Sequence, residues 1–268
     1  MDGKLLILNI LFGVLCLYGL QAEPLTGEKV EKISRSASFK QVVSISHIKK
    51  KTGRGDTQIC SGILISPQHV LTTERCLLNE DLGGLVVYIG SASLRGSKPY
   101  YLCGRISYSQ QNVEETVNRA LNYEIHDIAV VQLCEVVDMS VRGPHLSKST
   151  ITDLEGKQAI MIGWGKTDDD NLKYYKTRAT VTVLPKEVCQ LITNWRSFDT
   201  DRLICTFADP HVLATPRDYG GPLFVSHSNS LAGLTTGIYE KSGVYSPGVN
   251  IHANLTFYKD FIHQFSIP

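Results

Sequence analysis

The order of apolar and polar residues along the chain predicts mostly β-strands. Short segments rich in β-branched residues recur between residues 41 and 238, and turn-forming residues such as Gly220-Gly221-Pro222 separate them. The candidate strands are Gln41–Ile45, Gly62–Ile65, His69–Thr72, Leu85–Ile89, Ile128–Leu133, Ala159–Ile162, Ala179–Val183 and Leu231–Ile238. Many short strands with turns between them indicate an all-β barrel or sandwich rather than alternating βαβ units.

One helix is predicted, at residues 256–266. Its apolar residues follow helical spacing, and they are Phe257, Tyr258, Phe261, Ile262 and Phe265. We expect this face to dock on the β-structure. The remaining length accommodates two barrels of about 110–120 residues each, an ordinary domain size.

The first 22 residues have the pattern of a secretory signal. Lys4 precedes an apolar run from Leu5 to Leu20, and Gln21-Ala22 follows it. The alternative is a membrane anchor, but the run is 16 residues long, whereas a spanning helix needs about 20. We therefore expect cleavage after Ala22 and a secreted, extracellular product that is not inserted in a membrane.

Composition narrows the class of protein further. With 43% hydrophobic and 20% charged residues, the chain has enough apolar surface to fold. A net charge of +1, from 27 basic and 26 acidic residues, argues against a general nucleic-acid binder. Of seven cysteines, Cys16 lies in the predicted signal. The remaining six suggest three disulfides in an oxidising compartment, and six cysteines allow 15 pairings.

Three segments resemble those of the trypsin-like serine proteases, the S1 family with the chymotrypsin fold. Cys60–Cys76 is similar to the segment that carries the catalytic histidine, His126–Leu133 to the one that carries the aspartate, and Arg217–Leu223 to the serine loop. Gly163-Trp164-Gly165 is a further signature, and the segments occur in the order of the family. The resemblance implies two six-stranded antiparallel Greek-key β-barrels and a C-terminal α-helix.

The resemblance also divides the chain into segments. Residues 23–268 would form one peptidase S1-like domain after removal of the signal. The expected parts are a signal peptide at 1–22, an N-terminal segment at 23–38, a first β-barrel at 39–145, a second β-barrel at 146–255, and a C-terminal helix and tail at 256–268.

The positions of the catalytic triad are degenerate in this sequence. The histidine position holds Arg75, the serine position holds Tyr219, and only Asp127 matches the family. A guanidinium stays protonated at physiological pH and cannot act as a general base, and the phenol would have no base beside it. We therefore expect that the protein is not an enzyme. A salt bridge between Arg75 and Asp127 is a hypothesis for what replaces the catalytic contact.

The supporting positions of the site have changed as well. Arg217 replaces a glycine whose N–H helps to form the oxyanion hole, and Leu213 stands at the base of the specificity pocket. Thr236 begins the segment that pairs with substrate in the family, and Ile238 would narrow the pocket entrance. These changes agree with the loss of peptide hydrolysis.

The resemblance implies the pairing of the cysteines. Family members bridge the positions of Cys60 and Cys76, and of Cys189 and Cys205. The third bridge would then be Cys103–Cys134, on segments expected to be neighbouring strands of the first barrel.

Activation by proteolysis has no counterpart that the sequence reveals. Residues 23–38 contain no tetrapeptide like the Ile-Val-Gly-Gly terminus that pairs with the aspartate beside the serine in the family. That aspartate is retained as Asp218. It is therefore either paired internally or left as in a zymogen.

A basic loop is the first candidate for partner binding. Its residues are Lys49, Lys50, Lys51, Arg54, Gly55 and Asp56. The alternatives are an integrin-type Arg-Gly-Asp tip, a basic site for a glycosaminoglycan, and a solvated hairpin turn without function.

Other motifs carry weaker signals. Asn254 begins a glycosylation sequon. Asp168-Asp169-Asp170 lacks the alternating spacing of a calcium loop, and neither His126 nor His263 has metal-ligand spacing, so both are expected to be exposed or packing residues. We expect no metal and no cofactor.

Together these features predict a secreted, non-catalytic serine protease homologue that acts by protein binding. The resemblance implies a regulator, cofactor or decoy in an extracellular proteolytic, immune or reproductive-fluid pathway, with a protease, receptor or inhibitor as partner. Two alternatives are an active extracellular endopeptidase with atypical residues, and an adhesive or glycosaminoglycan-binding module that uses the basic loop.

Overall fold

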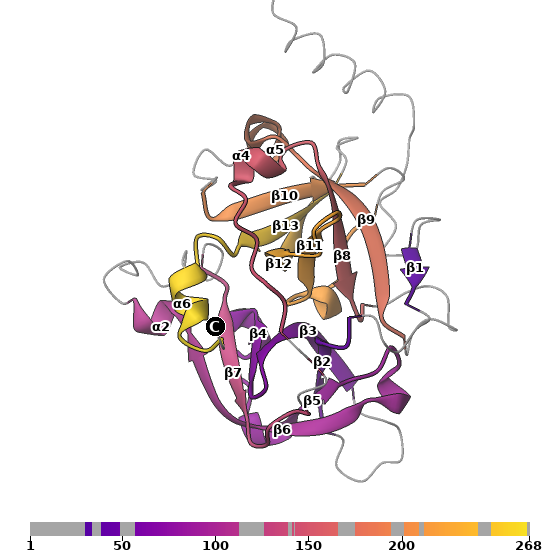
Figure 1. Ribbon diagram of the computed structural model, residues 1–268, viewed down its shortest axis with the longest axis vertical. Helices are drawn as coiled ribbons and strands as arrows, with labels where there is room; N and C mark the ends of the chain where they lie inside the picture. Colours follow the sequence, from indigo (N-terminus) through magenta and orange to yellow (C-terminus); the bar gives the residue numbers. More distant parts are fainter. Residues whose placement is uncertain are drawn as a thin grey trace, which may run out of the picture.

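The first half of the chain forms a closed antiparallel barrel. The computed structural model describes residues 30–33, 39–48, 57–112, 126–138, 141, 143–165, 175–193, 201–208, 212–240 and 248–266. Around the barrel the strand order is β2-β3-β4-β7-β6-β5 (Figure 1). The strands are β2 (Val42–His47), β3 (Thr57–Ser66), β4 (His69–Thr72), β5 (Leu85–Ile89), β6 (Lys98–Ser107) and β7 (Ala129–Leu133).

The second barrel contains six strands in the order β9-β10-β13-β12-β11-β8, and the pairing of β8 with β9 closes it. The strands are β8 (Gln158–Gly163), β9 (Thr177–Val183), β10 (Leu203–Phe207), β11 (Pro222–Val225), β12 (Leu231–Tyr239) and β13 (Val249–Asn254). The predicted architecture of two six-stranded antiparallel barrels is thus confirmed.

A short strand, β1 (Val30–Lys32), adds to the outside of the second barrel by pairing with β9. The sequence analysis predicted no element in this segment. Its register is supported by side-chain contacts with the second half of the chain: the Arg178 guanidinium bonds Glu31 with its Nε at 2.9 Å, and the Lys32 ammonium lies 3.4 Å from the centre of the Tyr175 ring.

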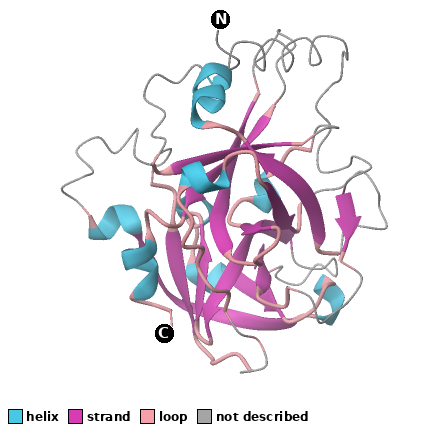
Figure 2. Ribbon diagram, turned by 45° about the horizontal axis from the view of Figure 1, so that its top comes forward, coloured by secondary structure: helices cyan, strands magenta, loops and turns pink. Residues whose placement is uncertain are grey.

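The helices are short and lie around the outside of the barrels (Figure 2). They are α2 (Tyr108–Gln111), α4 (Ile151–Leu154), α5 (Lys186–Thr193) and α6 (Lys259–His263), with 3-10 turns η1 (Glu74–Cys76), η2 (Leu82–Gly84), η3 (Leu94–Gly96) and η5 (Pro216–Asp218). None of the helices in the described part of the chain has the length and apolar character that a membrane crossing requires.

The C-terminal helix α6 is shorter than the predicted 256–266, because residues 255–258 form turns in which the Phe257 amide bonds the Asn254 carbonyl. The predicted apolar face nevertheless docks. Tyr258, Phe261 and Ile262 are buried, and the rings of Tyr258 and Phe261 pack edge-on against Tyr108 of α2.

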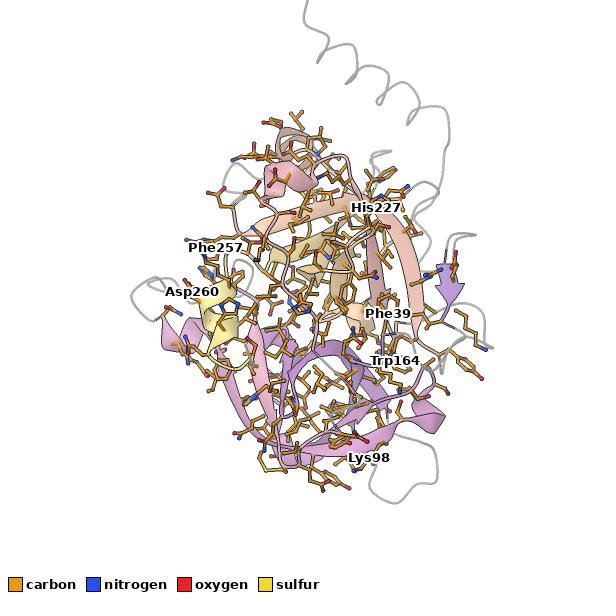
Figure 3. All side chains as sticks on the ribbon, viewed as in Figure 1. Phe39, Lys98, Trp164, His227, Phe257 and Asp260 are labelled. Atoms are coloured by element: carbon orange, nitrogen blue, oxygen red, sulfur yellow. A yellow bond between two sulfur atoms is a disulfide. The ribbon has the colours of Figure 1, made fainter. Side chains whose placement is uncertain are left out.

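An apolar layer between the barrels joins them into one body. It receives Val42 and Ile63 from the first barrel, and Phe224 and Leu234 from the second, together with Trp164. Figure 3 shows side chains filling this region around Trp164 and Phe39. Strand β2 is therefore buried on both faces: Val42 enters this layer on the face that also carries Ser44 and Ser46, while Val43 and Ile45 enter the first-barrel core.

Three disulfides join the predicted pairs. Cys60–Cys76 has a Cα separation of 6.1 Å, Cys103–Cys134 of 5.0 Å and Cys189–Cys205 of 6.0 Å, all within the usual range. The first ties β3 to η1, the second ties β6 to the end of β7, and the third ties α5 to β10. Each bridge lies within one barrel.

Candidate functional site at the junction of the barrels

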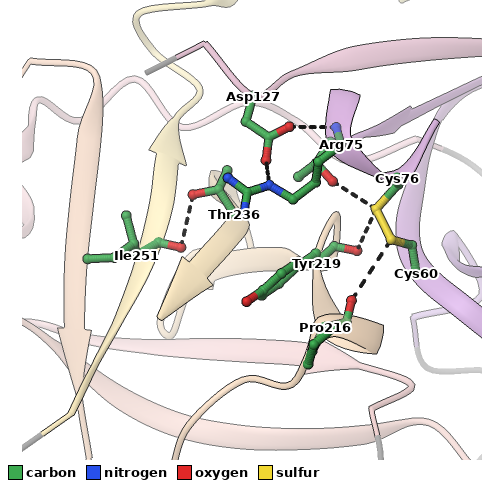
Figure 4. Close-up of polar contacts among 9 residues, drawn as sticks. Cys60, Arg75, Cys76, Asp127, Pro216, Tyr219, Thr236 and Ile251 are labelled. Carbon is green, nitrogen blue, oxygen red and sulfur yellow. Dashed lines mark hydrogen bonds and ion pairs between the residues drawn. A yellow bond between two sulfur atoms is a disulfide. The ribbon is translucent and has the colours of Figure 1, made fainter. Parts of the chain in front are cut away.

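Two strand ends at one edge of the first barrel bring Arg75 and Asp127 together. Arg75 lies in η1, directly after β4, and Asp127 lies just before β7. Strands β4 and β7 are antiparallel with Thr72 opposite Ala129, so the end of one and the start of the other meet at the same edge. Tyr219 reaches this edge from the second barrel, after η5 (Figure 4).

Arg75 and Asp127 form the ion pair that the sequence predicted. The Arg75 amide donates to Oδ1 of Asp127 at 2.8 Å, and the guanidinium Nε donates to Oδ2. The Asp127 side chain is 1% exposed, whereas that of Arg75 is 34% exposed. Removing either partner would leave a poorly solvated charge, so the pair is mutually dependent.

Burial raises the pKa of Asp127 to about 6, against the opposing effect of Arg75. The contact with a permanently charged guanidinium favours the ionised form of the carboxylate. Asp127 therefore serves as the counter-ion of a fixed guanidinium, which cannot accept a proton. The neighbouring His126 ring faces elsewhere, since its nitrogens contact the Tyr258 hydroxyl at 3.1 Å and the Arg202 guanidinium at 2.7 Å.

Tyr219 occupies the loop position where the resemblance places a nucleophile. Its ring packs against the first-barrel core, and the Arg75 guanidinium carbon lies 5.4 Å from the ring centre, within cation–π range. Burial raises the pKa of the Tyr219 phenol, so the hydroxyl remains protonated at neutral pH. With a guanidinium as its neighbour, this phenol has no base to activate it.

The backbone groups of the same loop are already hydrogen-bonded within the protein. The Tyr219 amide donates to the Pro216 carbonyl at 3.3 Å, and the Arg217 carbonyl accepts from Gln58 Nε2 at 3.0 Å and from Ser61 Oγ at 2.9 Å. An amide that already donates within its own turn is not aimed at a substrate oxyanion. Sequence reasoning considered the N–H and the side chain of Arg217 but did not predict this turn.

A signal for the turn is present in the sequence. Thr215 and Asp218 form a capping box around η5, and Pro216 stands at its first position, which is where proline favours helical turns. The Asp218 carboxylate accepts from the Thr215 amide at 2.8 Å, the Thr215 hydroxyl at 2.9 Å and the Gly165 amide at 2.7 Å. Asp218 is thus paired internally, which is the first of the two alternatives that the sequence allowed.

The environment of Asp218 also explains the Gly-Trp-Gly signature. A Cβ atom on Gly163 or on Gly165 would collide with the Asp218 carboxylate, so only glycine fits at these positions. Asp218 is completely buried, and burial raises its pKa to about 6.

The positions of the specificity pocket are lined by uncharged groups. Leu213 is buried, and a Cβ on Gly248 would lie 2.7 Å from its Cδ1, so the leucine packs tightly against that glycine. Thr236 is buried with its hydroxyl donating to the Ile251 carbonyl at 3.2 Å, and Ile238 packs partly against the second-barrel core. These groups therefore favour neither a cationic nor an anionic ligand side chain at the base of the pocket.

Several predicted features lie outside the described residues. They are the signal at 1–22, the basic loop with Lys49, Lys50, Lys51, Arg54, Gly55 and Asp56, and the aspartates 168–170. The loop joins the paired ends of β2 and β3, where His47 lies opposite Thr57. Within the described ranges, no group of three or more potential ligand side chains is placed to hold a metal ion.

Asn254 is a structural residue in the folded chain. It is 6% exposed, its Nδ2 donates to the Asp201 carbonyl at 2.7 Å, and its Oδ1 accepts from the Thr256 amide at 3.2 Å. Glycosylation of Asn254 stays a prediction, and this burial counts against it.

Comparison with curated proteins finds relatives among insect proteins. The chain is 23% identical over 206 residues to trypsin theta of Drosophila melanogaster, covering 73% of this chain and 72% of that protein. It is 27% identical over 189 residues to phenoloxidase-activating factor 3 of Holotrichia diomphalia, covering 65% of this chain and 53% of that protein. The chain thus spans about half the length of the second relative.

Solved structures share the fold. Neuropsin, a serine protease expressed in mouse brain, superimposes with a TM-score of 0.67 at 18% identity, covering 87% of this chain and 97% of that one. The VesB protease of Vibrio cholerae gives a TM-score of 0.68 at 17% identity, covering 91% and 68%. The family model described as Trypsin matches residues 33–262. Because that match spans most of the sequence, the chain belongs to the trypsin-like serine protease family with the chymotrypsin fold.

Proposed function

We propose that this chain is a secreted, non-catalytic member of the trypsin family that acts by binding another protein. The observation that carries the proposal is the Arg75–Asp127 ion pair, because it places a permanent cation where the family has its general base. Tyr219 in place of the serine and the internally bonded Tyr219 amide support the same conclusion. The apolar leader and three disulfides support export to an oxidising compartment.

Peptidase assays test the proposal directly. We expect the purified protein to release no product above the blank from a broad panel of fluorogenic peptides, and to remain unlabelled by a fluorophosphonate that reacts with active serine hydrolases. Asp127→Ala serves as the matched variant. Hydrolysis by the wild type that disappears in this variant would establish the rival reading, an active endopeptidase with atypical residues.

The partner would be a protease, a receptor or an inhibitor in an extracellular pathway. The similarity to a protein named phenoloxidase-activating factor 3 supports a regulatory role in the activation of another enzyme. Affinity capture from the fluid of the secreting tissue, with the Arg75→Gln variant as a parallel bait, would identify a partner whose binding involves this site.

A second candidate function is adhesion or glycosaminoglycan binding through the basic loop. It is favoured by the cations that follow one another in the sequence of the loop, Lys49, Lys50, Lys51 and Arg54, between the paired residues His47 and Thr57. Salt-sensitive retention on heparin that is lost when Lys49, Lys50 and Lys51 are replaced by serine would support the glycosaminoglycan version. Unchanged cell adhesion after replacement of Arg54 or Asp56 would exclude the integrin version.

A further inference from the structure

The site at the barrel junction presents its cations outward and its carboxylates inward. Asp127 and Asp218 are 1% and 0% exposed, and Glu74 is 7% exposed with its carboxylate accepting from the Ser109 hydroxyl at 2.6 Å. The Arg75 side chain, in contrast, is 34% exposed. Because the buried carboxylates are occupied by internal donors, the charge that a ligand would meet here is positive.

The Arg75 guanidinium is held in place without being fully used. Its Nε and its own backbone amide bond Asp127, while its two terminal amino groups have no polar partner among the residues that the structure describes. A guanidinium fixed by a buried counter-ion loses little conformational freedom when it binds. The planar fork of such a group matches a carboxylate, which it binds through two parallel hydrogen bonds.

Tyr219 supplies a second donor beside this fork. Figure 4 shows its ring below the guanidinium, at 5.4 Å from the guanidinium carbon. Its hydroxyl likewise has no hydrogen-bond partner within the described ranges. A protonated phenol next to a guanidinium can donate to the same anion.

Arg217 adds a further cation on the same loop. It is exposed, and its backbone is anchored by the bonds from Gln58 and Ser61 to its carbonyl. No acidic side chain within the described part of the chain forms an ion pair with it. It lies two residues before Tyr219 in the chain, within the η5 turn.

We propose that this junction binds an acidic segment of a partner protein. An aspartate or glutamate carboxylate of the segment would bond the free amino groups of Arg75 and the Tyr219 hydroxyl, and Arg217 would engage a neighbouring acidic residue. This inference rests on the proposed function, because it requires a site that binds the segment without cleaving it. The acidic character of the partner segment goes beyond the proposed function, because the Arg75–Asp127 ion pair alone does not indicate the chemistry of the partner.

The test uses a fluorescent peptide of alternating glutamate and alanine, with the same peptide carrying glutamine in place of glutamate as the neutral control. Binding is followed by anisotropy at physiological ionic strength. The full-length mature protein is compared with the variants Arg217→Gln and Tyr219→Phe, which change an exposed side chain and a single hydroxyl and so preserve the fold. Arg178→Gln, on strand β9 of the second barrel and in an ion pair with Glu31, is the control.

We expect the acidic peptide to bind at least about tenfold more tightly than the neutral one, the size of one charge-assisted hydrogen bond. Arg217→Gln and Tyr219→Phe should each weaken binding several-fold, and Arg178→Gln should leave it unchanged. Equal affinity for the two peptides, no binding at all, or binding insensitive to both site variants would overturn the inference. Binding that is lost only when Lys49, Lys50 and Lys51 are replaced would also overturn it and assign the anion site to the basic loop.

Mass spectrometry of the peptide after incubation separates the two proposals. Cleaved peptide contradicts the proposed function, whatever the affinity. Intact peptide without preference for glutamate contradicts only the acidic-segment inference and leaves the non-catalytic role in place.

Discussion

At the scale of single residues, Arg75 changes the chemistry of its position from proton transfer to charge pairing. A guanidinium donates hydrogen bonds and never accepts one, so the buried carboxylate of Asp127 becomes a structural partner. The pair links η1 to the start of β7. Its value to the fold comes from avoiding an unpaired buried charge rather than from the attraction itself.

This dependence predicts the effect of removing one partner. Arg75→Met should lower the free energy of unfolding by about 2–3 kcal/mol, less than the 3–5 typical of a fully buried pair because the guanidinium is partly exposed. Adding Asp127→Asn should restore part of the loss. Urea denaturation measures both, and Arg178→Gln, which breaks the exposed pair with Glu31, should cost less than about 1 kcal/mol. Equal losses for the two arginine variants would refute the argument.

The site was partly predictable at this scale. Arg75, Asp127 and Tyr219 could be placed because the segments around them resemble a known family, and the ion pair followed from their charges. The closed turn η5 was missed, because Thr215, Pro216 and Asp218, which mark it in the sequence, were not interpreted as a turn signal.

At the scale of strands, apolar patterns predicted eight of the twelve barrel strands, and β6, β10, β11 and β13 were not among the predicted segments. All eight predicted segments coincide with strands or parts of them. Strand β13 was missed because it buries polar residues: Asn250 donates to the Val212 carbonyl at 2.9 Å, and the His252 ring contacts the Thr206 hydroxyl at 2.8 Å. Polar residues of this kind favour a loop prediction from sequence, because their buried hydrogen-bond partners are known only from the structure.

Lys176, at the entrance to β9, is a second polar residue inside the fold. It is completely buried, its ammonium donates to the Phe39 carbonyl at 2.6 Å, and it lies 5.1 Å from the Trp164 ring. Burial lowers the pKa of Lys176 to about 7. It thus joins the residues that precede β2 to β9 at the cost of desolvating an amine.

The lowered pKa of Lys176 predicts a pH effect on stability. Between pH 7 and 10.5 the unfolded chain binds a proton that the folded chain has released, so the free energy of unfolding rises with pH through this window. Lys176→Met removes this contribution. The difference between wild type and variant should therefore change by about 1 kcal/mol per pH unit between pH 7 and 9.

Thermal unfolding of both proteins at several pH values in this range makes the comparison. Lys157→Met, at an exposed position, serves as control. Wild-type and Lys176→Met curves that run parallel from pH 7 to 9 would show that Lys176 does not titrate in the window.

At the scale of the whole molecule, the two barrels depend on the apolar layer between them. Each of the three disulfides lies within one barrel, so none of them holds the halves together. Trp164 is the largest fully buried side chain and packs in the shared layer. The cohesion of the molecule is therefore a matter of packing rather than covalent linkage.

Truncating this side chain should weaken both barrels at once. Trp164→Ala is expected to cost about 3–5 kcal/mol and to shift a single cooperative transition to lower denaturant concentration. Val136→Ala, at a site 62% exposed, should change stability by less than about 0.5 kcal/mol. Two separate transitions in the tryptophan variant, one unshifted, would show that the barrels unfold independently.

The internal pairing of Asp218 has a consequence for activation by proteolytic cleavage. In trypsin-like proteases, cleavage releases a new N-terminus whose ammonium pairs with this aspartate, and the cleavage thereby activates the enzyme. Here the Thr215 and Gly165 donors already satisfy it. An ammonium released by a cut near the N-terminus would have to displace these donors before it could pair with Asp218. If the chain acts by binding, as proposed, cleavage near its N-terminus would not be the step that switches binding on.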